Sequence, residues 1–261
     1  VCVFVFFLSC SFPVPKTETD IQRARLKYAY MLMRGKDLKT GEFAVNIRED
    51  NLKLFREKLD IVMDLNNWHS FLNLYAQVGY LSKSQISSNI AVVYSYALYL
   101  IGKYDYKVKS LELQSVIKKW IFMTTITAFF SSSAETTVEK ILADLREVKS
   151  DKDFVNYLNS QINNKFTDDF FNVTLPDLFK TSGNQSPAWF GFVASLIVLD
   201  VPNLFGTTTL AHFFIPGING TKKATDKHHI FPKNYLAKQG ITDDRTRNQT
   251  ANFTYLDYQT N

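Results

Sequence analysis

Apolar residues recur at helical spacing through most of the middle of the chain, and this pattern restricts the fold more than any other feature. Within residues 84–101, the apolar positions on one side of a helix are Ile86, Ile90, Val93, Ala97 and Leu100. Gly102 follows as a stop signal, and residues 111–130 are apolar on several faces, as in a buried central helix. The same period predicts helices at residues 17–34, 50–65 and 188–199. The fold class is therefore expected to be α+β and mostly α.

Two sequence signals predict where helices begin. Ser132 and Glu135 have the spacing of a capping box before a further amphipathic segment. Ser186 precedes Pro187, and proline is favoured at the first position of a helix. Aromatic side chains on these helices are interpreted as core residues.

Length and composition set the domain organisation. A chain of 261 residues with 46% hydrophobic and 21% charged residues is typical of a globular protein with one or two domains. The segment 217–225 is rich in Gly, Asn, Thr and Lys, which is typical of a loop. We therefore expect a mainly helical domain over residues 1–216 and a small module over residues 217–261.

Cysteine usage and the first ten residues limit the class of protein. Cys2 and Cys10 are the only cysteines, so neither a disulfide framework nor a four-cysteine zinc site can form, and a reducing cytoplasm is expected. Residues 1–10 are strongly apolar, but they are too short to span a bilayer and have no basic leader. We interpret them as a buried strand or core segment, with a clipped signal peptide as the alternative, and expect no membrane association.

The richest chemical pattern lies near the end of the chain, at His228-His229-Ile230-Phe231-Pro232, with Asn252 and Asn261 following it nine residues apart. Adjacent side chains of a strand leave opposite faces, so one histidine can bind a metal ion while the other faces a water molecule. Imidazole changes its protonation near neutral pH, which suits a general base. Phe253, Tyr255 and Tyr258 lie in a run that predicts a second strand.

This pattern resembles the HNH, or ββα-metal, endonucleases. The resemblance implies that His228 is the first metal ligand, His229 the general base, Asn252 a mainly structural residue that orients the strand or the base, and Asn261 the last metal ligand. His228 stands where aspartate is commoner in the family. Asp226, two residues earlier on the same strand face, could add a carboxylate ligand.

The implied ligands contain oxygen and nitrogen but no thiolate, which favours Mg²⁺ or Mn²⁺ as the cofactor. In the family a helix follows the last asparagine and packs on both strands. Because the chain starts at Val1 and ends at Asn261, we expect it to be a fragment with an incomplete ββα module.

Basic residues around the motif indicate the partner. The net charge of +5 is compatible with nucleic acid but does not require it. Beside a phosphodiesterase motif, contact with the DNA backbone is the better interpretation of the nearby basic residues. The residues expected to bind double-stranded DNA are Lys222, Lys223, Lys233, Arg245 and Arg247.

The order of a helical region followed by this motif is similar to the C-terminal half of GmrSD-type modification-dependent restriction proteins. The similarity is specific over residues 226–261 and weaker before them. It implies that the parent protein restricts foreign, typically modified, phage DNA in the cytoplasm of a bacterium or archaeon, with an N-terminal ParB-like NTPase domain that this sequence lacks.

Two other classes of function stay open at the level of sequence. The chain can be a nuclease-derived module that binds nucleic acid without cutting it. It can also be a helical interaction scaffold in which the histidine motif has no catalytic role.

Overall fold

A computed structural model describes residues 57–181, 186–215 and 225–257. The apolar stretch at residues 1–10, the helix expected at residues 17–34, and Lys222, Lys223 and Asn261 lie outside the described residues. The backbone of Asp226 is described, but its side chain is not.

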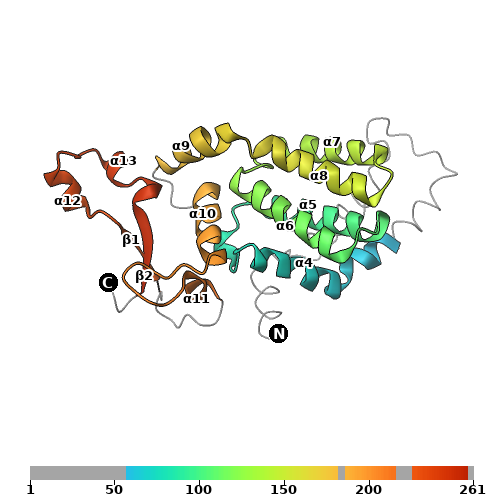
Figure 1. The fold of residues 1–261 in the computed structure, drawn as a ribbon, viewed down its shortest axis with the longest axis horizontal. Helices are drawn as coiled ribbons and strands as arrows, with labels where there is room; N and C mark the ends of the chain where they lie inside the picture. The colour runs from blue at the N-terminus through green and yellow to red at the C-terminus, as the bar shows by residue number, and fades with distance from the viewer. Residues whose placement is uncertain (1–56, 182–185, 216–224, 258–261) are drawn as a thin grey trace, which may run out of the picture. The chain divides into compact units, whose positions relative to one another are not determined.

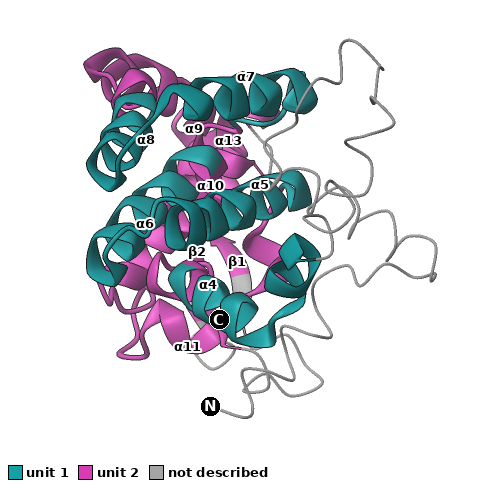
Figure 2. Ribbon diagram, turned by 90° about the vertical axis from the view of Figure 1, so that its right-hand side faces the viewer, with its two compact units in different colours: residues 1–74, 88–124, 129–162 teal, residues 75–87, 125–128, 163–261 magenta. Residues whose placement is uncertain are grey.

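The described chain divides into two compact units, which are coloured in Figure 2. Unit 1 contains the described residues of 57–74, 88–124 and 129–162, and unit 2 contains residues 75–87, 125–128 and the described part of 163–261. The domain limits expected from the sequence, at residues 216 and 217, stay a prediction.

Unit 1 is built from helices, which Figure 1 draws in blue to yellow-green. Residues 57–63 are helical. The elements that follow are α4 (Leu65–Gln77), α5 (Asn89–Leu100), the π-helical turn η3 (Ile101–Asp105), α6 (Ser110–Ile126), α7 (Ala134–Glu147) and α8 (Asp151–Lys165).

Large apolar side chains form the core of unit 1. Trp120, Phe154 and Ile117 are fully buried, as is Tyr96, whose hydroxyl donates to the carbonyl oxygen of Val62 (3.1 Å). Gly102 allows close approach, since a Cβ there would lie 2.6 Å from a methyl carbon of Leu113 and 2.8 Å from the Phe154 ring. The expected mainly helical class is confirmed.

Unit 2 has shorter helices and a two-stranded sheet. Its elements are η2 (Lys83–Gln85), η4 (Phe170–Thr174), α9 (Leu175–Phe179), α10 (Pro187–Val198), α11 (Leu210–Phe214), β1 (Thr225–His229), α12 (Lys233–Lys238), α13 (Asp244–Arg247), η5 (Thr250–Asn252) and β2 (Phe253–Asp257). Strand β1 pairs antiparallel with β2. A two-stranded ribbon is at best marginally stable alone, so it depends on packing against helices.

Helix α10 provides that support. Ser186 caps it by accepting from the Trp189 backbone N–H (3.1 Å), and Pro187 occupies the first turn, as the sequence predicts. Trp189, Val193 and Ala194 are buried. Gly79 packs against the same helix with φ +92°, where a Cβ would lie 2.2 Å from the Ala194 carbonyl oxygen.

Some helix limits differ from those expected. Helix α6 ends at Ile126 rather than at residue 130, because Ala128 takes a left-handed conformation (φ 50°). Helix α5 begins at Asn89, capped by Ser88, rather than at residue 84. The capping box expected at Ser132 is wrong: the N-cap of α7 is Ser133, whose φ of 49° is left-handed and whose side chain makes no capping hydrogen bond. No helix among the described residues is long and apolar enough to cross a membrane.

Candidate metal-dependent hydrolytic site

Both histidines of the sequence motif lie at the end of β1. The register of the hairpin pairs His228 with Thr254 and His229 with Phe253. Since side chains alternate along a strand, the two imidazoles project from opposite faces of the hairpin. The second strand that the sequence predicts is present as β2 (Phe253–Asp257).

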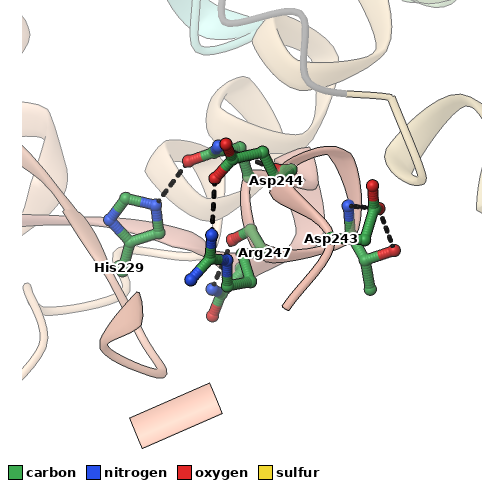
Figure 3. A network of polar contacts seen from close by, with 7 residues as sticks. His229, Asp243, Asp244 and Arg247 are labelled. Carbon is green, nitrogen blue, oxygen red and sulfur yellow. Dashed lines mark hydrogen bonds and ion pairs between the residues drawn. The ribbon is translucent and has the colours of Figure 1, made fainter. Parts of the chain in front are cut away.

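The imidazole of His229 is held on two sides. Its ring centroid lies 4.5 Å from that of Phe253, and its Nε2 lies 3.1 Å from Oδ1 of Asn248 (Figure 3). The Asn248 amide has a defined orientation, because its Nδ2 donates to the carbonyl oxygen of Asp244 (2.7 Å). An amide oxygen can only accept, so Nε2 of His229 holds the hydrogen. Its Nδ1 therefore has the free lone pair of the neutral ring.

His228 has the opposite arrangement. Its Nδ1 lies 3.0 Å from the backbone carbonyl oxygen of His229, which can only accept. Nδ1 therefore holds the hydrogen, and Nε2 has the lone pair. A hydrogen bond from the other ring nitrogen to a carbonyl is the usual support of a metal-binding histidine.

Asn252 connects the two ends of the loop between the strands, and its side chain is buried. Its Oδ1 accepts from the Phe231 backbone N–H (2.8 Å), and its Nδ2 donates to the carbonyl oxygens of Phe231 (3.1 Å) and Arg247 (3.0 Å). Asn252 is the last residue of η5, directly before β2. Its contacts fix the backbone directly after the histidines.

The loop helix α13 places the basic and acidic residues near His229. Asp243 caps it by accepting from the Thr246 backbone N–H (2.7 Å), and hydrogen bonds from Thr246 lower the pKa of this carboxyl group. Arg247 pairs with Asp244 (2.7 Å; Figure 3) and its side chain is only 18% exposed. Lys233 and Arg245, by contrast, are exposed. The phosphate contacts expected of these basic residues stay a prediction.

Only part of the expected metal ligand set is described. Within residues 57–181, 186–215 and 225–257, no three His, Cys, Asp or Glu side chains gather around one point. The donor chemistry of His228 nevertheless fits, because its Nε2 makes no hydrogen bond to the described residues and its Nδ1 is supported by a carbonyl oxygen. The side chains of Asp226 and Asn261 belong to the undescribed part of the chain.

Sequence reasoning missed Asn248 and Lys227. The sequence around Asn248 contains no signal for its bond to His229, which depends on the fold of the loop. Lys227 lies on the same strand face as His229, and its Nζ is 4.5 Å from the centroid of the Trp189 ring and 4.1 Å from that of Phe253. Its position two residues before His229 is the one signal that the sequence offers.

Lys227 is an unusual amine. Its Nζ is shielded from solvent and has no hydrogen-bond partner among the described residues. Burial lowers the pKa of Lys227 from 10.5 to about 8, because the charged form loses its hydration. The two aromatic faces offset part of that cost, since the ring quadrupole attracts a cation.

The hairpin is anchored to the helical part of unit 2 at two further points. Trp189 Nε1 donates to the hydroxyl oxygen of Tyr255 (3.3 Å). Both the backbone N–H and the hydroxyl of Thr250 donate to the carbonyl oxygen of Thr181 (2.8 Å each). The histidines are therefore presented on a ribbon fixed to a packed core.

Comparison with known proteins identifies no relative: no protein-family model matches the chain, and no curated protein or solved structure matches it.

Proposed function

We propose that the chain is a metal-dependent endonuclease that hydrolyses phosphodiester bonds in DNA, with His229 as the general base and His228 as a metal ligand. The observation that supports this proposal most is that the two adjacent imidazoles have opposite tautomers. His229 is held through Nε2 by Asn248, and His228 is held through Nδ1 by a backbone carbonyl. Each ring keeps one lone pair for chemistry.

In the proposed reaction, Nδ1 of His229 takes a proton from a water molecule as the water oxygen forms a bond to phosphorus. The bond from phosphorus to the leaving sugar oxygen breaks, and that oxygen takes a proton from solvent. The Asn248 oxygen continues to accept from Nε2 of the imidazolium, which stabilises the charge that develops there. His228 would hold a divalent cation, which would supply neutralisation of the charge on the phosphate oxygens.

The substrate and cellular role rest on the motif resemblance together with the exposed basic residues of the loop. We infer double-stranded DNA, foreign and typically modified, as the substrate class. Restriction of phage DNA in a prokaryotic cytoplasm, together with an N-terminal NTPase domain, is part of the same proposal.

The test is plasmid nicking by the full-length protein with Mg²⁺ or Mn²⁺. Conversion of supercoiled to open-circular plasmid that stops on chelation is expected. DNA binding without any nicking in either cation would overturn the nuclease assignment in favour of a binding module. The absence of both binding and nicking would favour an interaction scaffold.

A further inference from the structure

Apolar side chains are exposed in the loop that directly follows His229. Phe231 is 55% exposed and Tyr235 51% exposed. Ile230, directly before Phe231, and Ile241, farther along the loop, are also exposed. A buried core does not explain these residues. Phe231 lies two residues after the proposed base, and Tyr235 lies on the short helix that follows, so both are candidates for substrate contact.

The two aromatic rings are arranged as a pair. The centroids of Phe231 and Tyr235 lie 6.4 Å apart, with an angle of 22° between the ring planes. The backbone beneath them is fixed, because Asn252 bonds both the N–H and the carbonyl of Phe231, and the Leu236 N–H donates to the Pro232 carbonyl at the start of α12. A fixed backbone limits where the two rings can lie, which reduces the conformational entropy that is lost when a flat ligand binds to them.

The charge around the pair suits a polyanion. Lys233 and Lys238 lie on the same short helix as Tyr235 and form no ion pair with the described residues. The acidic residues of the loop are engaged within it, since Asp243 caps α13 and Asp244 pairs with Arg247. Exposed aromatic faces flanked by free lysines are typical of surfaces that bind unpaired nucleotides.

We propose that Phe231 and Tyr235 form a stacking platform for an unpaired nucleobase, so that the substrate is DNA with unpaired nucleotides next to the scissile phosphate. This inference rests on the proposed nuclease function and narrows its substrate. A base inside a duplex has both faces covered by its neighbours, whereas an unpaired base can place a face on an aromatic ring. The lysines contact the adjoining phosphates.

The test compares binding of two DNA duplexes that differ only in a central bulge, one with three thymines and the other with three abasic nucleotides. Both bulges have the same phosphates, so their affinity ratio measures the contribution of the bases. Binding is followed by fluorescence anisotropy in EDTA, where the DNA stays intact. We expect the full-length protein to bind the thymine bulge about 10-fold more tightly or better, which corresponds to the usual effect of one stacked base.

Variants of Phe231 and Tyr235 test whether the two rings cause the affinity ratio between the thymine bulge and the abasic bulge. Phe231→Leu and Tyr235→Leu should each reduce it, and Phe231→Trp should preserve it because the aromatic face remains. Phe205→Leu, at a phenylalanine that is 83% exposed on another segment, is the matched control and should keep the ratio of the wild type. Circular dichroism checks the fold of each variant.

The outcomes separate the platform from the nuclease assignment. A wild-type ratio near one, or a ratio that both leucine variants preserve, would overturn the platform even if the protein cuts plasmid. A base-dependent ratio lost in those variants would support the platform even if no cutting occurred. If Phe231→Leu and Tyr235→Leu misfold, Phe231→Ser and Tyr235→Ser replace them. A ratio that falls toward one in the folded variants supports the proposal, and a wild-type ratio in both contradicts it.

Discussion

At the scale of single residues, the proposed reaction depends on which nitrogen of each histidine has the lone pair. Asn248 and the His229 carbonyl assign the two rings opposite tautomers, with the lone pair on Nδ1 of His229 and on Nε2 of His228. In the proposed reaction the first takes the proton of water and the second holds a cation. The amide orientation of Asn248 is in turn set by the Asp244 carbonyl oxygen. If His229 is the general base, Asn248 therefore sets the tautomer of that base through a hydrogen bond to its other ring nitrogen.

Replacing Asn248 should lower the cleavage rate through His229. Asn248→Ala removes the oxygen that accepts from Nε2, and the loss of about 1 kcal/mol from one hydrogen bond corresponds to a roughly fivefold lower kcat. Asn248→Asp keeps an acceptor and should retain more activity than the alanine variant. Single-turnover cleavage over a pH series measures both. Equal rates for the alanine variant and the wild type at every pH would show that Asn248 does not position the base.

The part of the site that sequence could predict is the part within the local motif. The strand alternation that separates His228 from His229 follows from their adjacency, and the aromatic run predicted β2. Asn248 lies 19 residues after His229, and the contact between them exists only because the loop folds back. No local pattern encodes such a contact.

At the scale of elements, the hairpin depends on α10 and on the aromatic faces around Lys227. The ammonium lies between Trp189 and Phe253, on the same strand face as His229. Burial of the charged Lys227 amine costs free energy at neutral pH. The stability of unit 2 therefore depends on pH.

The stability of unit 2 should rise between about pH 8 and pH 10. Below pH 8 both the folded and the unfolded chain keep the Lys227 proton, and the desolvation of the charged amine opposes folding in full. Above the folded pKa of about 8, the folded state has released that proton while the unfolded state, with a pKa near 10.5, still holds it. Because the unfolded state then binds more protons, stability increases with pH.

Urea unfolding at pH 7 and pH 9.5 measures this dependence, with EDTA present so that no metal contributes. Lys227→Met should remove the Lys227 part of the rise and increase stability at pH 7. Lys233→Met, at an exposed lysine, is the matched control and should keep the rise. A rise of the same size in Lys227→Met and the wild type would exclude Lys227 as its source.

Helices with a strong apolar periodicity could be predicted from the sequence, but the residues at which they begin and end could not. The helices within residues 84–101 and 111–130 are present as α5 and α6. The end of α6 and the start of α7 are set by left-handed residues, Ala128 and Ser133, and neither residue type signals that conformation. Tertiary packing selects these conformations. A prediction from local sequence therefore places the helix ends a few residues away from their true positions.

At the scale of the whole molecule, exposed basic residues should determine how binding depends on salt. Each phosphate contact releases counterions, so Lys233→Ala or Arg245→Ala should reduce the slope of log affinity against log salt by about 0.9 and weaken all DNA sequences alike. Lys152→Ala, at an exposed lysine of α8, is the control and should leave the slope unchanged. A loss confined to one DNA sequence would identify base contacts instead.

Chelation should separate activity from folding. The core of unit 1 consists of buried apolar side chains such as Trp120, Phe154 and Ile117, and the hydrophobic effect stabilises it without a cation. EDTA is therefore expected to stop DNA cleavage and to leave the helical circular dichroism signal intact. Loss of the helical signal in EDTA would instead indicate a structural metal.

The most direct test of the central claim is the single-turnover nicking rate of His229→Ala against the wild type in Mg²⁺ or Mn²⁺. General-base catalysis contributes about 10²- to 10⁴-fold, so the variant should lose that factor while its DNA affinity and helical signal stay those of the wild type. His212→Ala, at a histidine of α11, is the matched control and should nick at the wild-type rate. Near-normal nicking by His229→Ala would contradict the general-base role of His229.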